Sequence, residues 1–190
     1  MRVAEPGPIY TIGHSTLPRD EFIAVLRGHG IGLLVDIRTV PRSRTNPQYN
    51  QDVLPAALAE AGIGYTHLAR LGGLRGRRKD LPAGESANGA WRNDSFRNYA
   101  DYALTPAFAA GLDELIALAT GPTAIMCAEA VWWRCHRRIV ADYLLVRGVP
   151  VLDLIPPAPP EAHTLTPFAR AQPDGTILYP PMEEAADGSA

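Results

Sequence analysis

The chain has 190 residues, of which 46% are hydrophobic and 20% charged, and this composition is typical of a globular protein with one core. Its formal net charge of −2 excludes a global field that would draw it to nucleic acid or membranes, so anion binding must come from local patches. Two cysteines exclude a disulfide-rich secreted scaffold, and without a long apolar run we expect a cytoplasmic protein that does not enter a membrane.

Five short apolar runs predict buried strands, and they alternate with segments of helical periodicity. This alternation predicts a three-layer α/β fold in which helices flank a mostly parallel sheet. Thr105 followed by Pro106 is typical of a helix start, because threonine caps a helix and proline fits its first turn. The predicted strands are residues 9–13, 32–37, 63–68, 123–127 and 149–155, and the predicted helices are residues 18–27, 52–61, 96–103, 106–119 and 135–146.

The composition changes after residue 155. Residues 1–155 hold all these elements and are expected to form the α/β domain, whereas eight of the 18 prolines fall in residues 156–190. Within residues 156–182, a proline-rich link leads to PFARAQPDGTILYP, which predicts a β-hairpin that turns at Pro173-Asp174-Gly175. We expect residues 183–190 to be disordered.

Polar residues follow four of the predicted strands at the point where each strand ends. His14 follows the first strand, Asp36 and Arg38 the second, Gly72-Gly73 the third, and Cys127 ends the fourth. The carboxyl ends of parallel strands lie at one edge of a sheet, where ligands bind in open α/β folds. We therefore expect these residues to form one site.

Several of these residues suit an anion. Arg38, Arg42 and Ser43 lie in a loop bracketed by prolines, and guanidinium groups there suit a phosphate or a carboxylate. Gly72-Gly73 would let the backbone approach a ligand, and Arg137 would add charge at a predicted helix start. The alternative is a solvated loop whose arginines pair with acidic neighbours.

Glu129 is the main candidate for acid–base chemistry. It lies just beyond a buried strand and close to two tryptophans, so we expect partial desolvation to raise its pKa. His14 and Asp36 are candidates to assist it. The alternatives are an ion pair between Glu129 and a nearby arginine and, for Asp36, orientation of Arg38.

Cys135 and His136 lie at the predicted start of the last helix, where backbone N–H groups lower the pKa of a thiol, so both are catalytic candidates. The alternative is that Cys135 is buried and inert, as is also expected of Cys127. Arg134 lies one residue too far from Cys127 for a cysteine-phosphatase loop. The spacing matches no zinc motif, so no metal ligand is assigned, although ligands that converge from several strands stay possible.

Five ordered motifs resemble a known family: TIGHST, LVDIRTVPRSRTNP, GIGYTHLARLGG, SFRNYADYALT and MCAEAVWWRCHRRIVADYL. The set resembles the bacterial and archaeal family called domain of unknown function 488 over residues 9–155. The C-terminal hairpin is similar to that of longer members of the family. The resemblance implies a cytosolic α/β domain and supports the choice of site residues, but it implies no reaction.

These patterns predict an enzyme that hydrolyses a phosphate-containing substrate, such as a nucleotide or nucleic-acid component, or transfers a group from it, with a carboxylate as acid or base. The sequence requires no cofactor, and the partner is a phosphate-containing small molecule or single-stranded nucleic acid, since a basic loop and tryptophans suit base stacking. The alternatives are a thiol- or metal-dependent redox protein that uses Cys127 and Cys135, and a non-catalytic nucleic-acid-binding module. Catalysis is assigned to Glu129, His14, Asp36, Cys135 and His136, and anion binding to Arg38, Arg42, Ser43, Gly72, Gly73 and Arg137.

Overall fold

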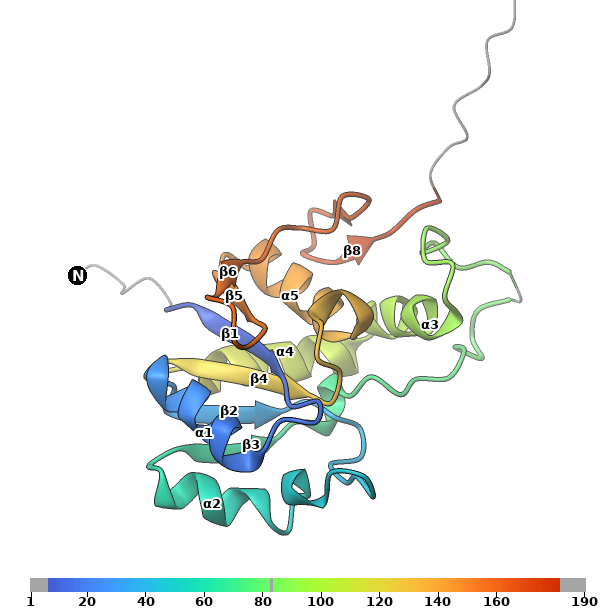
Figure 1. Cartoon of the computed structure of the whole chain (residues 1–190). Helices are drawn as coiled ribbons and strands as arrows, with labels where there is room; N and C mark the ends of the chain where they lie inside the picture. The colour runs from blue at the N-terminus through green and yellow to red at the C-terminus, as the bar shows by residue number, and fades with distance from the viewer. Residues whose placement is uncertain (1–6, 83, 182–190) are drawn as a thin grey trace, which may run out of the picture.

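The computed structural model describes residues 7–82 and 84–181, and its centre is a single sheet (Figure 1). The strands are β1 (Ile9–Gly13), β2 (Leu33–Asp36), β3 (Gly64–His67), β4 (Thr123–Cys127), β5 (Val151–Leu154) and β6 (Glu161–Ala162). Their order in the sheet is β3-β2-β4-β1-β5-β6. All neighbours are parallel except β6, which is antiparallel to β5, so the predicted mostly parallel sheet is confirmed.

Helices cover both faces of this sheet, as predicted for three layers. Phe22 and Leu26 of α1 and Leu54 and Leu58 of α2 are buried against one face. The other three helices are buried against the opposite face, and Figure 1 shows α1 in front of the sheet and α4 behind it. The helices are α1 (Arg19–Gly28), α2 (Leu54–Glu60), α3 (Asp94–Ala103), α4 (Pro106–Leu118) and α5 (Arg137–Val146), with short 3-10 turns η1 (Pro47–Tyr49), η2 (Ala69–Leu71) and η3 (Trp132–Arg134).

Two helix starts are fixed by side-chain caps. Thr105 accepts a hydrogen bond from the amide of Phe108, which confirms the predicted start of α4. The Asn93 side chain accepts from the amides of Ser95 and Phe96, so α3 begins two residues earlier than the apolar pattern predicts. The first turns of α3 lie at the carboxyl edge of the sheet.

The strands meet at that edge because backbone hydrogen bonds continue past their ends. The amide of His14 donates to the carbonyl of Cys127 at 3.0 Å, and the amide of Ile37 donates to the carbonyl of Met126 at 3.0 Å. The loops that follow β1, β2 and β4 therefore begin side by side. The arrows of β2 and β4 point toward this edge, on the right in Figure 1.

The C-terminal segment adds a hairpin and an edge strand. β7 (Arg170–Ala171) pairs with β8 (Ile177–Leu178), and Gly175 takes a φ of +82° in the turn, which confirms the predicted hairpin. Ile177 and Tyr179 are fully buried in the same core as α3, α4 and α5. The two-residue β6 was not predicted, since a proline-rich segment carries no strand pattern. The predicted disordered tail, 183–190, lies outside the described residues.

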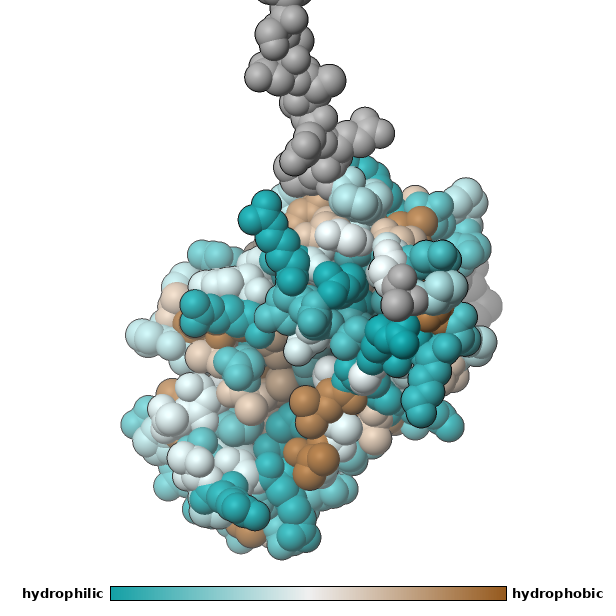
Figure 2. All heavy atoms as spheres, turned by 90° about the vertical axis from the view of Figure 1, so that its right-hand side faces the viewer, coloured by the Kyte–Doolittle hydropathy of each residue, from teal (hydrophilic) through white to brown (hydrophobic). Residues whose placement is uncertain are grey.

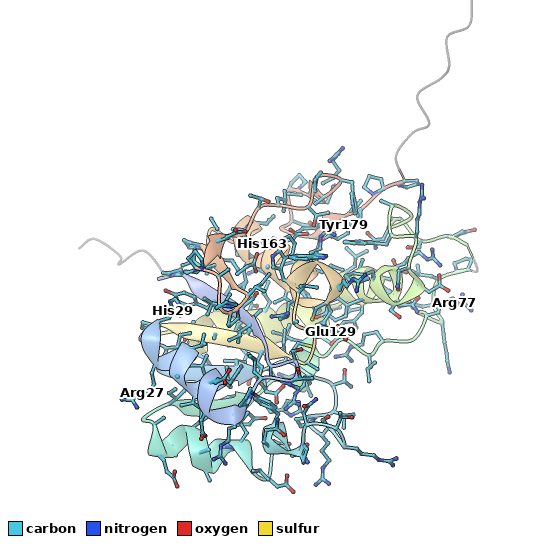
Figure 3. All side chains as sticks on the ribbon, in the orientation of Figure 1. Arg27, His29, Arg77, Glu129, His163 and Tyr179 are labelled. Carbon is cyan, nitrogen blue, oxygen red and sulfur yellow. The ribbon has the colours of Figure 1, made fainter. Side chains whose placement is uncertain are left out.

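A buried ion cluster attaches this segment to the α/β core. His163 Nδ1 lies 2.7 Å from a carboxylate oxygen of Asp153, and its Nε2 lies 3.3 Å from one of Asp142. Burial alone would lower the pKa of His163, but hydrogen bonds to Asp142 and Asp153 raise it to about 9. The Tyr179 hydroxyl also donates to Asp142, at 2.9 Å. Figure 3 labels His163 and Tyr179 in this part of the molecule.

Candidate functional site

A cleft of about 430 Å³ opens at the carboxyl edge of the sheet. It is lined by the residues that follow β2 and β4, by Gly73 and Leu74, and by the first turns of α3. Figure 2 faces this side of the molecule and shows hydrophobic side chains at the surface among hydrophilic ones. Val40 and Leu74 belong to the lining and are 55% and 75% exposed, so the rim of the cleft is partly apolar.

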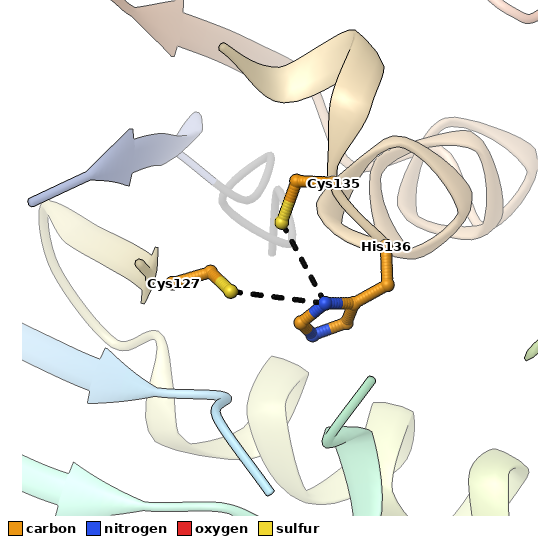
Figure 4. Close-up of side chains that lie close together, drawn as sticks. All are labelled: Cys127, Cys135 and His136. Carbon is orange, nitrogen blue, oxygen red and sulfur yellow. Dashed lines mark hydrogen bonds between the residues drawn. The ribbon is translucent and has the colours of Figure 1, made fainter. Parts of the chain in front are cut away.

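Two cysteines and a histidine meet in the buried part of the lining (Figure 4). The Sγ atoms of Cys127 and Cys135 lie 3.8 Å and 3.6 Å from the same nitrogen, Nδ1 of His136. All three potential ligand atoms lie within 4.8 Å of one another. The sequence spacing indicated no such cluster, because β4 and the turn η3 bring Cys127 and Cys135 together only in three dimensions.

The orientation of the His136 ring is fixed from two sides. Its Nε2 donates to the carbonyl of Ile37 at 3.0 Å, so the neutral ring carries its lone pair on Nδ1, between the sulfurs. Gly73 packs directly against the ring, and a Cβ atom at this position would lie 2.4 Å from Nδ1. Gly73 therefore makes room for the imidazole, whereas the sequence predicted that it makes room for an anion.

The two thiols differ in proton affinity. Burial alone would raise the pKa of Cys135, but a hydrogen bond with Cys127 and the His136 and Arg137 side chains lower it well below its ordinary value. The hydrogen bond to Cys135 and burial raise the pKa of Cys127 well above its ordinary value. Of the two thiols, Cys135 therefore loses its proton more readily. Cys135 precedes the N-cap His136 and lies outside α5. The pKa of Cys135 is therefore lowered by the neighbouring side chains and not by the start of the helix, as the sequence had suggested.

Arg137 is fully buried and does not line the cleft. Its Nε donates to the sulfur of Cys135 at 3.4 Å, and its Nη2 donates to the carbonyl of Glu129 at 2.6 Å. Nη1 has no hydrogen-bond partner among the described residues. Gly13 permits this packing, since a Cβ atom there would lie 1.7 Å from the Glu129 carbonyl oxygen. Arg137 thus supports Cys135 and the loop after β4, a role different from the predicted anion contact.

Asp36 and Arg38 form a buried ion pair beside the cleft. Nη2 of Arg38 lies 2.6 Å from a carboxylate oxygen of Asp36, which also accepts from the Tyr65 hydroxyl at 2.8 Å. Arg38 lines the cleft and Asp36 does not. Asp36 therefore orients Arg38, which was the alternative interpretation of its position in the sequence.

His14 lies behind the same arginine. It is buried and stacks on Tyr49 with ring centroids 4.1 Å apart. Nδ1 donates to the carbonyl of Ser15, and Nε2 accepts from Nη1 of Arg38 at 3.3 Å. Burial lowers the pKa of His14 to about 4, so the ring is neutral near pH 7. His14 positions Arg38 and, within the described structure, does not line the cleft.

Of the remaining residues predicted to bind an anion, Arg42 and Ser43 line the cleft and Gly72 does not. The Arg42 side chain is 71% exposed, with only a distant contact of 4.0 Å to Asp52. Gly72 is buried against Thr39, whose Oγ1 would lie 2.5 Å from an added Cβ atom. Gly72 is therefore a packing glycine, and a ligand has no access to it.

Glu129 lines the cleft but is exposed, so the partial desolvation predicted from the sequence is wrong. Trp133, which was expected to shield it, is itself 47% exposed. No ion pair or hydrogen bond holds the Glu129 carboxylate within the described structure, so the alternative of a structural ion pair has no support either. Figure 3 labels Glu129 at the end of the sheet toward which the strands point.

Two of the side chains that suggested nucleic-acid stacking have structural partners, whereas Trp133 is exposed. Trp91 is only 7% exposed and stacks on Phe96 with ring centroids 4.9 Å apart. Arg75 donates to the carbonyls of Gly72, Ala69 and Arg70 and lies over the Tyr102 ring. These side chains stabilise the loop after β3 and are not free to bind bases.

The apolar part of the cleft was not predicted from the sequence. Val40 and Leu74 lie in loops without periodicity, so no pattern distinguishes them from ordinary surface residues. Phe96 and Tyr99 line the cleft from the first turns of α3. The approach of α3 to the strand ends is a tertiary contact, so the sequence carried no signal for these two.

No helix among the described residues is long and apolar enough to cross a membrane. Comparison with curated proteins and with solved structures gives no match. A family model described as "Domain of unknown function DUF488" matches residues 18–144, and the chain therefore belongs to this family.

Proposed function

We propose that the protein is an enzyme that binds a small phosphate-containing substrate, such as a nucleotide, in the cleft and hydrolyses it or transfers a group from it. The observation that carries the proposal is the joint presence of arginines, an apolar rim and a Cys–His cluster in one cleft. Such a cleft at the carboxyl edge of a parallel sheet is the usual ligand site of this architecture.

The charge of the lining favours an anion. Arg38, Arg42 and Arg134 line the cleft, and Glu129 is the acidic residue among the lining side chains. Arg38 is held by Asp36, His14 and the Tyr49 carbonyl, which leaves it one Nη1 hydrogen for a ligand. Arg42 and Arg134 are exposed and can close around a phosphate from the rim.

The apolar rim favours a substrate with a flat or apolar part as well as a charged one. Val40, Leu74 and Phe96 lie in the same cleft as the arginines. A nucleoside phosphate has this combination, because its base is planar and its phosphate is anionic. The volume of about 430 Å³ falls in the range of small-molecule sites.

Glu129 is our proposed acid or base. It lies two residues after Cys127, in the loop that follows β4, and it lines the cleft. Its carboxylate forms no hydrogen bond or ion pair with a described residue. Substrate binding would cover it, and the loss of water would then favour proton transfer. Glutamine at this position keeps the shape and removes the proton-transferring group.

The test begins with binding. Calorimetry against inorganic phosphate, ribose phosphates and nucleoside mono-, di- and triphosphates should give at least one saturable interaction, and turnover of the tightest binders is then measured. Arg42→Gln and Arg134→Gln should each weaken binding by about 10-fold. The matched control is Arg27→Gln, at an exposed arginine on α1 that Figure 3 shows far from Glu129.

For the catalytic step, Glu129→Gln should lower turnover by about 100-fold while binding is retained, and Glu60→Gln, an exposed control on α2, should leave turnover unchanged. Full activity of Glu129→Gln would remove this residue from the mechanism. A wild-type protein that binds no compound of the panel would refute the proposed function.

A further inference from the structure

We propose that Cys127, Cys135 and His136 form a binding site for a thiophilic divalent metal ion, Zn²⁺ above all, with its fourth coordination position open to the cleft. The three side chains all line the cleft, and they come from the end of β4 and from the segment between η3 and α5. The proposal stands independently of the phosphate substrate, because it concerns the ligand set alone.

The distances agree with a tetrahedral zinc site. Zn–S bonds of about 2.3 Å and Zn–N bonds of about 2.0 Å place a sulfur and a nitrogen ligand about 3.5 Å apart. The sulfurs of Cys135 and Cys127 lie 3.6 Å and 3.8 Å from Nδ1 of His136. All three ligand atoms lie within 4.8 Å of one another, so a metal ion at their common centre requires only small side-chain rotations.

A metal also accounts for the sharing of one lone pair. Nδ1 of the neutral His136 ring has a single lone pair, and both sulfurs approach it at comparable distances. A hydrogen bond would use that lone pair for only one of the two thiols, although the sulfur of Cys135 also accepts from Arg137. A metal ion at the centre uses the lone pair and both sulfurs at the same time.

The surroundings are those of a supported metal ligand set. A histidine ligand usually donates its second ring N–H to a carbonyl or carboxylate, and His136 donates Nε2–H to the Ile37 carbonyl at 3.0 Å. The sulfur of Cys135 accepts from the buried Arg137 at 3.4 Å, which stabilises a thiolate ligand. Gly73 leaves open the space next to Nδ1.

The ligand types and their number indicate the class of metal site. Two thiolates and one imidazole select Zn²⁺ over Mg²⁺ or Ca²⁺, which prefer oxygen ligands. Three protein ligands with a fourth position for water are typical of catalytic zinc sites, whereas structural sites have four protein ligands. Zinc here would lower the pKa of its water to about 7 and supply a nucleophile inside the cleft.

The first experiment measures metal in the full-length protein. Protein purified under reducing conditions and reconstituted with Zn²⁺ should retain about one equivalent per chain after desalting, as determined by elemental analysis. Replacement by Co²⁺ should give thiolate-to-cobalt charge-transfer absorption together with the visible bands of a tetrahedral ion. These spectra report sulfur ligation directly and need no variant.

Ligand variants then assign the site. Cys127→Ser, Cys135→Ser and His136→Gln should each lower Zn²⁺ affinity by at least about 100-fold. His29→Gln changes a partly buried histidine outside the cluster and should leave metal binding intact. Thermal unfolding of each variant without metal shows that the fold persists, so that the loss of metal is not a loss of structure.

A pair of glycine variants keeps every ligand. Gly73→Ala places a Cβ atom 2.4 Å from Nδ1 of His136 and should displace the ring, weakening Zn²⁺ binding by about 10- to 100-fold. Gly76→Ala is the matched control, because a Cβ atom there has no neighbour within 4 Å. Equal Zn²⁺ affinities of the two variants would contradict the proposed geometry.

Three results would overturn the site as a whole. The first is less than about a tenth of an equivalent of Zn²⁺ in the reconstituted wild type. The second is metal that persists in all three ligand variants. The third is a Cys127–Cys135 disulfide that forms in air and that Zn²⁺ does not prevent. The last would favour a dithiol redox role. Stoichiometric zinc without phosphate binding would refute the proposed function and leave the metal site standing.

Discussion

The buried cluster around His163 gives a stability prediction whose sign and size follow from the structure. The His163 side chain is fully buried between the carboxylates of Asp142 and Asp153. Its pKa is about 9 in the folded protein and 6.5 in an unfolded chain, so folding takes up a proton between these values. The difference corresponds to about 3 kcal/mol of stability. This contribution is complete below pH 6.5 and is lost as the pH rises through 9.

The perturbation is His163→Gln, and the assay is urea unfolding of both proteins between pH 6.5 and pH 10. Near pH 7 the variant should be less stable by about 3 kcal/mol, because two buried carboxylates lose their cation. Toward pH 10 the wild type loses the same contribution, so the difference should shrink to less than about 1 kcal/mol. Taking this difference cancels the titration of cysteines and tyrosines, which both proteins share.

The control is His29→Gln, which changes a partly buried histidine at the C-terminal end of α1, outside the cluster, and should follow the wild type at every pH. If wild type and His163→Gln differ by the same amount at pH 7 and pH 10, His163 is not a buried cation and the reasoning is wrong. If they do not differ at all, the cluster does not hold the C-terminal segment to the core.

Other parts of the fold give further predictions. Asp36→Asn removes the charged partner of the buried Arg38, so it should lower the free energy of unfolding in urea by about 3 kcal/mol and weaken phosphate binding. An unchanged urea midpoint would mean that water replaces the carboxylate. Asn93→Ala removes the cap of α3 and should cost about 1 kcal/mol, with Ser95→Ala as a near-neutral comparison at an exposed position. Gly13→Ala forces a Cβ atom against the Glu129 carbonyl, so it should destabilise the protein more than Asp36→Asn or Asn93→Ala does. Thermal unfolding followed by circular dichroism would measure the difference.

Local sequence signals predicted most of the architecture, because the strands and helices depend on nearby residues. TAIMC of β4 is fully buried as predicted, whereas β3, at the edge of the sheet, is only partly buried, so its predicted burial is wrong. Thr105-Pro106 marks a helix start that the structure confirms. The edge strand β6 has no such signal. β6 lies beside β5 because the next residue, His163, is buried there. The amide of His163 donates to the Val151 carbonyl, and its ring contacts Asp153 of β5 and Asp142 of α5.

The location of the site was predictable, but several roles within it were not. The carboxyl ends of parallel strands lie at one edge of a sheet, which predicted that Arg38, Cys127 and Glu129 lie close together. All three line the same cleft. A glycine in the sequence indicates that another atom comes close, yet it does not tell whether that atom belongs to a ligand or to the protein. At Gly72 and Gly73 the close neighbours are Thr39 and His136.

The same ambiguity applies to charged residues before a loop. Asp36 was a candidate acid or base, and the structure uses it to orient Arg38. The burial of a carboxylate depends on atoms that are distant in sequence, so the desolvation expected of Glu129 was assigned to the wrong residue. The desolvated groups are instead Cys127 and Cys135, and the guanidinium group beside Cys135 belongs to Arg137.

The metal proposal and the substrate proposal support each other through charge. Without metal, loss of the Cys135 proton would leave a negative charge at the wall of the cleft, which would partly cancel the attraction of Arg38 and Arg42 for an anion. With Zn²⁺ bound, the charges of two thiolates and the metal ion sum to zero, so the arginines and the buried Arg137 leave a net positive field at the open coordination position. A phosphate oxygen would then find a Lewis acid and guanidinium groups in the same cleft, and this combination suits hydrolysis better than a dithiol does.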